Sequence, residues 1–277
     1  MTHEAFEIFV IGLGLNTPLQ VTQEAEQTLA LCKHVYFLHT EPYWTKRYLA
    51  RFCSDVTDLQ SCYEDGEDRI NAYDLMVSAV LDGAKSSPPV ALALYGSPAV
   101  FVNPTQQIRC LAERDGLKVK VLPGISAMEC MLVDLGVDPS DGMLVYEAND
   151  MLAYRKPLLP GAHCFVWQIG GVESELFSKA SSAGHRFRRI KEYLLKFYPP
   201  DHLVAIVSCA TMPTVATTID RIRIADLESE SLALHQGTTL YIPPLPEQYT
   251  PDLEYIERLS SPEHLTSITL SEGASGP

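Results

Sequence analysis

The sequence contains no Cys-x-x-Cys motif, and its seven cysteines are an odd number. Most of them stand in apolar surroundings, where a free thiol behaves as a small hydrophobic side chain. We therefore expect neither a disulfide framework nor a zinc site, and we expect a reducing, cytoplasmic location. The eight histidines show no metal-ligand spacing, so we expect no metal in a functional site.

Long apolar runs are also absent. No run approaches the roughly 18 residues that a membrane-spanning helix requires, and the polar, acidic start before Phe6 is unlike a secretory signal. Basic residues are few: the sequence has 21 Lys and Arg against 35 Asp and Glu, which gives a net charge of -14. Phosphate contacts need clustered cations. We therefore expect neither a membrane nor a nucleic acid as partner, and the basic cluster at residues 186–191 fits an exposed helix face.

What is present suits a large buried core. Of the 277 residues, 46% are hydrophobic and 20% are charged, an ordinary balance for a globular protein. The length fits two domains or one large α/β unit. The Asp-Pro-Ser-Asp-Gly stretch at residues 138–142 interrupts the pattern of strands and helices. We predict an α/β protein with one domain at residues 1–141, a mixed-sheet domain at residues 142–245 and a tail at residues 246–277.

The hydrophobic patterns predict alternating strands and helices. In the first half they predict strands at 6–11, 35–38, 56–59, 89–94 and 119–122, and helices at 22–34, 41–52, about 69–85, 105–114 and 126–135. In the second half they predict strands at 144–147, 164–169, 203–209 and 239–242, antiparallel strands within 211–227, and helices at 187–197 and 253–259. We expect no helix beyond residue 259.

Three of the predicted strands run into turns that contain glycine. Gly12 follows the first strand in Gly-Leu-Gly, which lacks the third glycine of a dinucleotide-binding fingerprint. Tyr95-Gly-Ser-Pro and Pro123-Gly-Ile-Ser-Ala follow two later strands, and Ser126 is placed to cap the next helix. Ligands bind beyond the carboxyl ends of strands in open α/β sheets. The turns therefore predict one small-molecule crevice, with ordinary strand-to-helix turns as the alternative.

A second candidate cluster precedes and begins the third predicted helix. Arg69 and Tyr73 are four residues apart and share one helix face, and Tyr63 lies just upstream. A guanidinium beside a phenol favours the phenolate, which can act as a base. The alternative is a surface arginine packed along a tyrosine ring.

In their order, Gly12-Leu13-Gly14, the Tyr95 turn, the Pro123 turn and Thr238-Thr239-Leu240-Tyr241-Ile242 resemble the tetrapyrrole methylase superfamily. The resemblance covers about residues 6–245. It implies two α/β domains with S-adenosylmethionine (SAM) in the cleft between them, and S-adenosylhomocysteine as the product. The implied cofactor contacts are Gly12, Tyr95, Ser97, Val100, Phe101, Ser126, Ala127, Gln168, Thr238 and Thr239. Gln168 and the two threonines also fit as ordinary strand residues.

A narrower resemblance, to the borosin α-N-methyltransferases, is carried by residues 95–101 and 130–139, by Trp167-Gln168-Ile169 and by Tyr63, Arg69 and Tyr73. That family methylates backbone amides of a ribosomal precursor peptide. The resemblance implies Tyr73 as the base, Arg69 as its activator or as the holder of the imidate, and Tyr63 as the group that binds the carbonyl. Tyr95 then positions the methyl group and the amide, and Glu147, Asn149 and Trp167 are peptide-groove candidates.

The same resemblance implies partners. No apolar core-peptide repeat follows the second predicted domain, so we expect the split, bacterial type, whose precursor is a separate protein with a small helical docking domain. The enzyme is then a homodimer and the complex a heterotetramer. Ser97 stands where the family often has His, and the acidic Gly-Asp-Pro turn of the tetrapyrrole enzymes is absent. The alternatives are a precorrin or other small-molecule methyltransferase and a non-catalytic SAM- or peptide-binding scaffold.

Overall fold

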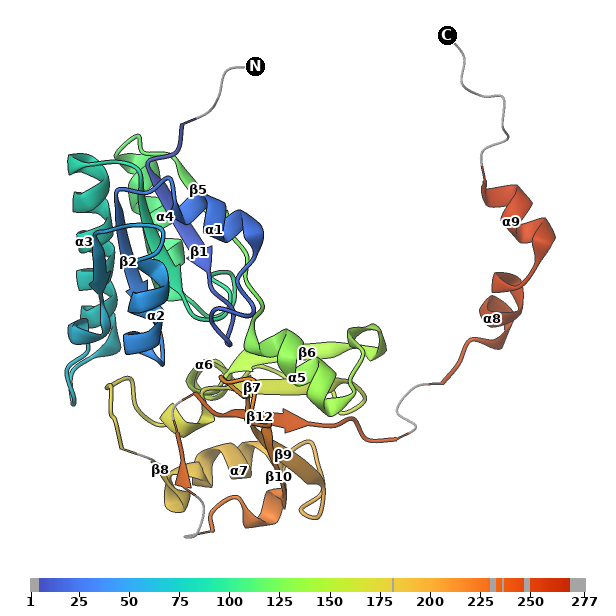
Figure 1. Cartoon of the computed structure of the whole chain (residues 1–277). Coiled ribbons are helices and arrows are strands. Elements are labelled where there is room, and N and C mark those ends of the chain that lie inside the picture. The colour runs from blue at the N-terminus through green and yellow to red at the C-terminus, as the bar shows by residue number, and fades with distance from the viewer. Residues whose placement is uncertain (1–4, 181, 230–232, 236, 247–249, 270–277) are drawn as a thin grey trace.

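The computed structural model describes residues 5–180, 182–229, 233–235, 237–246 and 250–269. Consecutive parts of the chain form two five-stranded sheets, one above the other in Figure 1. A two-stranded pairing of β8 (Ser182–Ala183) with β11 (Ala233–Leu234) lies beside the second sheet. The α/β architecture expected from the sequence is therefore confirmed.

The first sheet is parallel throughout. Its strand order is β3-β2-β4-β1-β5, and its parallel pairings run from β2 with β3 to β1 with β5. The strands are β1 (Ile8–Gly12), β2 (His34–Leu38), β3 (Val56–Asp58), β4 (Val90–Leu94) and β5 (Val119–Leu122). Every residue of β1 and β4 is buried, as continuous apolar runs in a parallel sheet require.

Helices cover both faces of this sheet because alternate side chains of a strand point to opposite faces. Ile8 and Val10 pack with α3 (Arg69–Ser86) and α4 (Asn103–Arg114). Phe9 and Ile11, between them in the sequence, pack with α1 (Gln23–Leu29) and α2 (Pro42–Leu49). The result is a three-layer unit with its carboxyl strand ends directed toward the second sheet (Figure 1).

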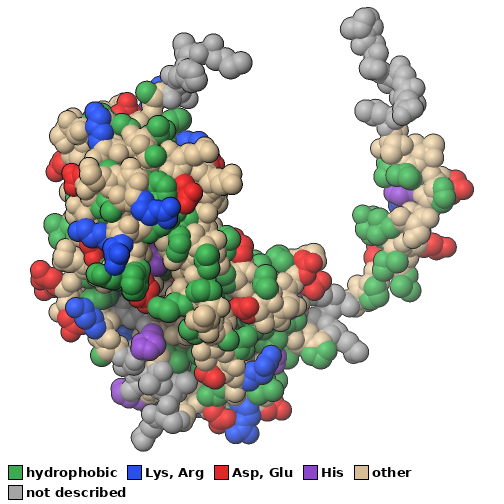
Figure 2. All heavy atoms as spheres, in the orientation of Figure 1, with side chains coloured by type: hydrophobic (Ala, Val, Ile, Leu, Met, Phe, Trp, Pro, Cys, Tyr) green, Lys and Arg blue, Asp and Glu red, His purple; other side chains and the backbone are tan. Residues whose placement is uncertain are grey.

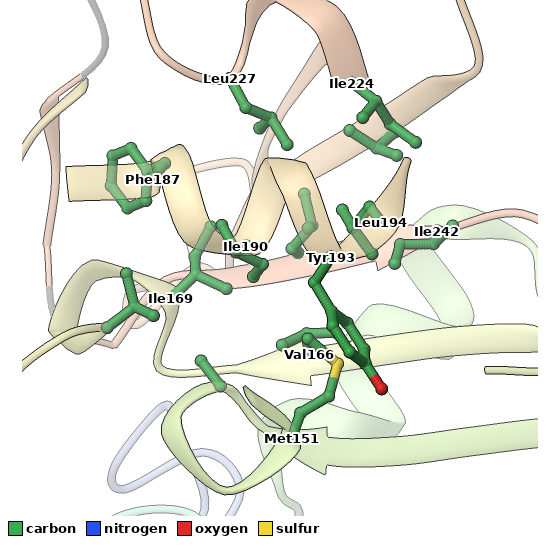
Figure 3. Packing of buried hydrophobic residues seen from close by; sticks show 14 of the residues in the cluster. Met151, Val166, Ile169, Phe187, Ile190, Tyr193, Leu194, Ile224, Leu227 and Ile242 are labelled. Atoms are coloured by element: carbon green, nitrogen blue, oxygen red, sulfur yellow. The ribbon is translucent and has the colours of Figure 1, made fainter. Parts of the chain in front are cut away.

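The second sheet is mixed, with the order β10-β9-β12-β7-β6. The pair β6–β7 is parallel and the remaining pairs are antiparallel. The strands are β6 (Met143–Glu147), β7 (His163–Trp167), β9 (Leu203–Ser208), β10 (Thr218–Arg223) and β12 (Thr239–Ile242). On one face, α6 (Ala148–Ala153) and α7 (Arg188–Leu194) bury Met151, Ile190 and Leu194 against the strands (Figure 3).

Helix α5 (Ala127–Leu135) connects the two sheets. It begins at the turn after β5, before the predicted domain boundary, yet its buried Met131 packs on the other face of the second sheet, with Phe165, Ala205, Val207 and Tyr241. This packing fixes the turn after β5 relative to the second sheet. The position of the cleft between the sheets therefore depends on α5.

Most predicted elements are present, with ends shifted by a few residues. The prediction that residues 211–227 hold several strands was wrong, because β10 is the one strand that the structure describes there. The prediction of a loose tail was wrong at α9 (Pro262–Ile268). Helix α6, which the sequence did not predict, has six residues and is too short for a periodic pattern.

Helices α8 (Leu253–Leu259) and α9 stand apart from the two sheets (Figure 1). Apolar side chains gather on them in Figure 2, and Leu253, Leu259 and Leu265 are exposed. On the sheet-bearing part, basic and acidic side chains are scattered over the face shown in Figure 2. None of the helices in the described part of the chain is long and apolar enough to cross a membrane.

Candidate functional site

A cleft of about 790 Å³ lies between the two sheets. Its first wall comes from the turns that follow β1, β4 and β5, including Leu15, Tyr95 and Ser126. The opposite wall comes from residues after β7 and β9 and before β12, including Gln168 and Thr238. This volume is within the range of small-molecule sites, about 300–1,000 Å³. The crevice predicted from the glycine turns is therefore present at the carboxyl ends of the strands.

Glycine contacts hold the three turns of the first wall together. A Cβ atom on Gly12 would lie 2.5 Å from the nitrogen of Gly124, and one on Gly124 would lie 2.4 Å from the carbonyl oxygen of Gly96. The backbone of Gly14 and Gly96 is joined by hydrogen bonds of 3.1 and 2.8 Å. No L side chain fits at such an approach. Gly12 lies behind the wall rather than in the cleft lining, so the structure gives it a packing role.

The other nine predicted cofactor residues all line this cleft. They are Tyr95, Ser97, Val100, Phe101, Ser126, Ala127, Gln168, Thr238 and Thr239. Ser126 caps α5, since its hydroxyl accepts a hydrogen bond from the nitrogen of Met128 at 3.1 Å and its backbone nitrogen donates to Glu129 at 2.7 Å. The predicted helix cap at Ser126 is confirmed. Ser97 is buried, and its Oγ lies 3.5 Å from the nitrogen of Ala99.

Two residues with positive φ face the cleft from opposite sides. Phe101 has φ 53° and Gln168 has φ 57°, a left-handed conformation that bulky residues rarely adopt. The Phe101 ring stacks on Trp167 with centroids 4.9 Å apart, and the stack connects the first wall to the end of β7. Such strain persists where surrounding contacts enforce it, often at binding sites.

Three tyrosines, Tyr63, Tyr73 and Tyr95, also line the cleft. The rings of Tyr63 and Tyr73 meet edge to face at 6.2 Å. Burial raises the pKa of Tyr63, its neighbours Tyr73 and Tyr95 and a hydrogen bond with Tyr73 raise it further, and the charge of Arg69 opposes the shift. Desolvation, with Tyr73 nearby, also raises the pKa of Tyr95. Tyr63 and Tyr95 therefore keep their protons, and the hydroxyl of Tyr63 can donate a hydrogen bond to the oxygen of Tyr73.

The guanidinium of Arg69 reaches from the start of α3 to the second sheet. It donates to Oε1 of Gln168 at 3.0 Å and to Oε2 of Glu175 at 2.9 Å, and its Nε donates to the carbonyl of Glu175 at 3.1 Å. Among the described residues, no hydrogen bond joins it to Tyr73. The sequence predicted an Arg69–Tyr73 pair. Helical spacing places the two residues on one face, but it does not determine where a long side chain finds its acceptors.

Residues 173–179, here called the strap, pack against Tyr63 and Arg69 and do not themselves line the cleft. The strap pairs with the segment before α3 through hydrogen bonds of 2.9 Å from Gly66 to Phe177 and 2.8 Å from Phe177 to Glu67. The Phe177 ring stacks on Tyr63 at 4.7 Å. The amide of Asn149 donates to Glu175 at 3.0 Å. The strap therefore supports both Tyr63 and Arg69 from behind. No pattern in the sequence predicted this segment.

The three peptide-groove candidates have different positions. Trp167 lines the cleft. Glu147 caps α6 by accepting from the nitrogen of Asp150 at 2.8 Å, and desolvation raises its pKa. Asn149 holds the strap. In the described part of the chain, no group of three or more His, Cys, Asp or Glu side chains is placed to bind a metal ion.

The model of the family described as tetrapyrrole (corrin/porphyrin) methylases matches residues 7–225. Among curated proteins, the chain is 29% identical over 259 residues to a "methyltransferase/ribosomally synthesized cyclic peptide gymnopeptides precursor" of Gymnopus fusipes, covering 92% of this chain and 61% of that protein. It is 30% identical over 241 residues to a type III borosin cyclic peptide precursor methyltransferase of Anomoporia bombycina, covering 86% of this chain and 28% of that protein. This chain therefore spans less than two thirds of these relatives.

Solved structures agree on the fold. A uroporphyrin-III C-methyltransferase of Thermus thermophilus, in complex with S-adenosylhomocysteine, has a TM-score of 0.58 at 15% identity, with 86% of this chain and 92% of that chain covered. The cobalt precorrin-4 methyltransferase of cobalamin biosynthesis also has a TM-score of 0.58 at 15% identity, with 85% of this chain and 94% of that chain covered. At this identity the likeness establishes the two-sheet fold.

Proposed function

The chain belongs to the tetrapyrrole (corrin/porphyrin) methylase family and is a SAM-dependent methyltransferase, and from this premise we propose that it methylates backbone amide nitrogens of a ribosomal precursor peptide. The observation that carries the proposal is that Tyr63, Tyr73 and Tyr95 line the same cleft as Ser97, Ser126 and Thr238. The relatives that are named as fused methyltransferases and cyclic peptide precursors support a peptide as the substrate class.

The cleft fits SAM by its lining. Glycine turns let backbone groups approach a ligand closely, and Ser97, Thr238 and Thr239 line the cleft together with the apolar Leu15 and Val100. These residues would hold the cofactor, with Gln168 at the opposite wall. When bound, SAM supplies an activated methyl group on sulfur.

Amide nitrogen is a poor nucleophile because its lone pair is delocalised into the carbonyl. The nitrogen must lose its proton as it gains the methyl group, so the site needs a base and a donor to the carbonyl oxygen. We assign Tyr73 as the base that takes the amide proton. Tyr63, whose raised pKa keeps it protonated, lies beside that base.

The negative charge that develops on the amide oxygen needs a second donor. Tyr63 has one hydroxyl proton, and in this assignment that proton is directed to the oxygen of Tyr73. Tyr95, whose raised pKa keeps it protonated, is then the donor to the carbonyl oxygen. In this assignment Arg69 holds Gln168 and the strap in place behind Tyr63.

We also propose that the peptide belongs to a separate cytoplasmic precursor with a small helical docking domain, and that the enzyme acts on it as a homodimer. The test is to co-express the chain with each small protein encoded beside it and to measure one-methyl mass steps on both polypeptides. Methyl groups on backbone amides of the small protein support the proposal. Methyl groups confined to this chain's own residues would indicate a substrate in the same polypeptide.

The matched variants are Tyr73→Phe and Tyr198→Phe. We expect Tyr73→Phe to lower the methylation rate by about 100-fold or more while SAM still binds, because a general base contributes roughly 10²–10⁴-fold. Tyr198, whose hydroxyl has no hydrogen-bond partner in the described structure, is the control and should leave the rate unchanged. A precorrin as the methylated substrate, or full biological function in Tyr73→Phe, would point instead to a tetrapyrrole enzyme or to a non-catalytic scaffold.

A further inference from the structure

His39 occupies a buried position at the back of the cleft wall. It directly follows β2, and 3% of its surface is exposed. Strand β4 lies between β2 and β1 in the sheet. The His39 side chain reaches past the end of β4, where Tyr95 stands, to the loop after β1, and its Nε2 lies 3.0 Å from Oγ1 of Thr17. The imidazole meets the Tyr95 ring edge to face, with centroids 6.2 Å apart and an interplanar angle of 79°.

The hydrogen bonds around His39 determine its tautomer. The backbone nitrogen of Glu41 donates to Nδ1 at 3.0 Å, so Nδ1 carries no proton. Nε2 therefore carries the proton and donates it to Thr17, whose hydroxyl in turn donates to the carbonyl of Leu13 at 3.2 Å. Burial lowers the pKa of His39 to about 4, which agrees with a neutral ring at neutral pH. Each proton in this chain of hydrogen bonds has one acceptor.

We propose that neutral His39 is a positioning residue for Tyr95, an inference that rests on the proposed function. The Tyr95 backbone is held by a 3.1 Å hydrogen bond from its nitrogen to the carbonyl of Leu38, but 44% of the residue is exposed and it lines the cleft. On its protein side the ring meets the His39 imidazole, which Thr17 and Glu41 hold rigidly. His39 therefore acts through the hydroxyl position of Tyr95, and on the transfer step rather than on cofactor affinity.

Two neutral variants divide the contacts of His39. His39→Asn keeps an acceptor for the Glu41 nitrogen but is too short to reach Thr17 or Tyr95. His39→Gln keeps a donor for Thr17 and part of the contact with Tyr95. We expect His39→Asn to lower kcat for methylation of the co-expressed precursor by about tenfold, with KM for SAM changed less than about twofold. His39→Gln should retain more of the activity than His39→Asn does.

A double-mutant cycle separates positioning from a general loss of stability. In a Tyr95→Phe background, single-turnover rates should change less than about twofold on His39→Asn, because the hydroxyl that His39 positions is then absent. The same tenfold loss in both backgrounds would overturn the proposal, since His39 would then act independently of Tyr95.

A second measurement needs no turnover. With S-adenosylhomocysteine added, the ¹³C ring signals of Tyr95, assigned from Tyr95→Phe, should shift in His39→Asn while those of Tyr198 stay in place. The ¹⁵N spectrum of the wild-type protein should show the His39 proton on Nε2. Unchanged Tyr95 signals, or a proton on Nδ1, would contradict the proposal. If the wild-type enzyme methylates no peptide, the proposed function fails, and these spectra still decide the role of His39.

Discussion

The turns after β1, β4 and β5 line the cleft, and the strap supports Tyr63 and Arg69 from behind, but different kinds of contact hold the two regions. In the turns, backbone atoms of Gly12, Gly96 and Gly124 touch directly. At the strap, side chains from two halves of the chain meet, with Arg69 on Gln168 and Glu175 and Phe177 on Tyr63. The turns can pack this closely because glycine has no Cβ atom. The strap is held by the hydrogen bonds of Arg69 and the stacked rings of Phe177 and Tyr63.

This difference predicts opposite sensitivities. The glycine turns should tolerate the loss of a neighbouring side chain, but one carbon added to a glycine should destabilise them, because packed backbone cannot move aside. The strap should tolerate small changes in volume and reject the loss of a hydrogen-bonding group, because Arg69 is largely buried. Substitutions in the glycine turns and at the strap test the comparison directly.

The largest expected effect is that of Gly124→Ala. Its Cβ would lie 2.4 Å from the carbonyl oxygen of Gly96 and 2.8 Å from the carbonyl carbon of Gly12. We expect the free energy of unfolding in urea to fall by about 3 kcal/mol or more, with loss of SAM binding. Gly116→Ala is the control, since its added methyl meets nothing within 4 Å and its φ of 71° costs about 1 kcal/mol. Equal losses in the two variants would contradict the glycine-contact account.

Arg69→Lys should have the next largest effect. A lysine keeps the charge but loses the planar fork that bonds Gln168 and Glu175 together. We expect kcat/KM for peptide methylation to fall about 100-fold, which is about 2.7 kcal/mol, with a small change in stability. Glu175→Gln, which keeps the shape of an acceptor that is 65% exposed, should cost less than about fivefold. If Glu175→Gln were as harmful as Arg69→Lys, the charge of the pair and not the fork would matter.

Acid titration of His39 should have a smaller effect, on stability. The pKa of His39 is about 4 in the folded protein and about 6.5 in an unfolded chain. The unfolded state therefore binds more protons between these values, and stability falls as pH decreases from about 6.5 toward 4. We expect about 2 kcal/mol of the wild-type loss between about pH 7.5 and 5 to come from His39. Urea unfolding of His39→Asn at both pH values should lack that part. An identical pH dependence in the two proteins would refute it.

Ser97→Ala should have the smallest effect. Its hydroxyl makes a weak 3.5 Å contact with the nitrogen of Ala99, and the neighbouring backbone is held by the glycine contacts. We expect the Kd for SAM, measured by calorimetry, to rise less than about threefold, in line with about 0.5 kcal/mol for a weak neutral hydrogen bond. A rise of about 30-fold or more would show that this wall holds its ligand by side chains.

The elements of the cleft that sequence alone revealed are local ones. The apolar runs of β1 and β4, the glycine turns after them and the cap at Ser126 each depend on residues a few positions apart. Helix α6 escaped prediction because its six residues give too little periodicity to recognise. The strap escaped because Arg69 and Glu175 are separated by 106 positions, and no local pattern connects them.

The sequence by itself determined the α/β class, the two-part order of strands and the places where the chain must turn tightly, because backbone conformation and hydrophobic alternation are properties of neighbouring residues. Only the tertiary structure decided that α5 packs on the second sheet, that Arg69 turns to Gln168 rather than to Tyr73, and that His39 meets Tyr95. Those choices depend on which acceptors and surfaces long-range packing brings within a few ångströms, which sequence spacing does not encode.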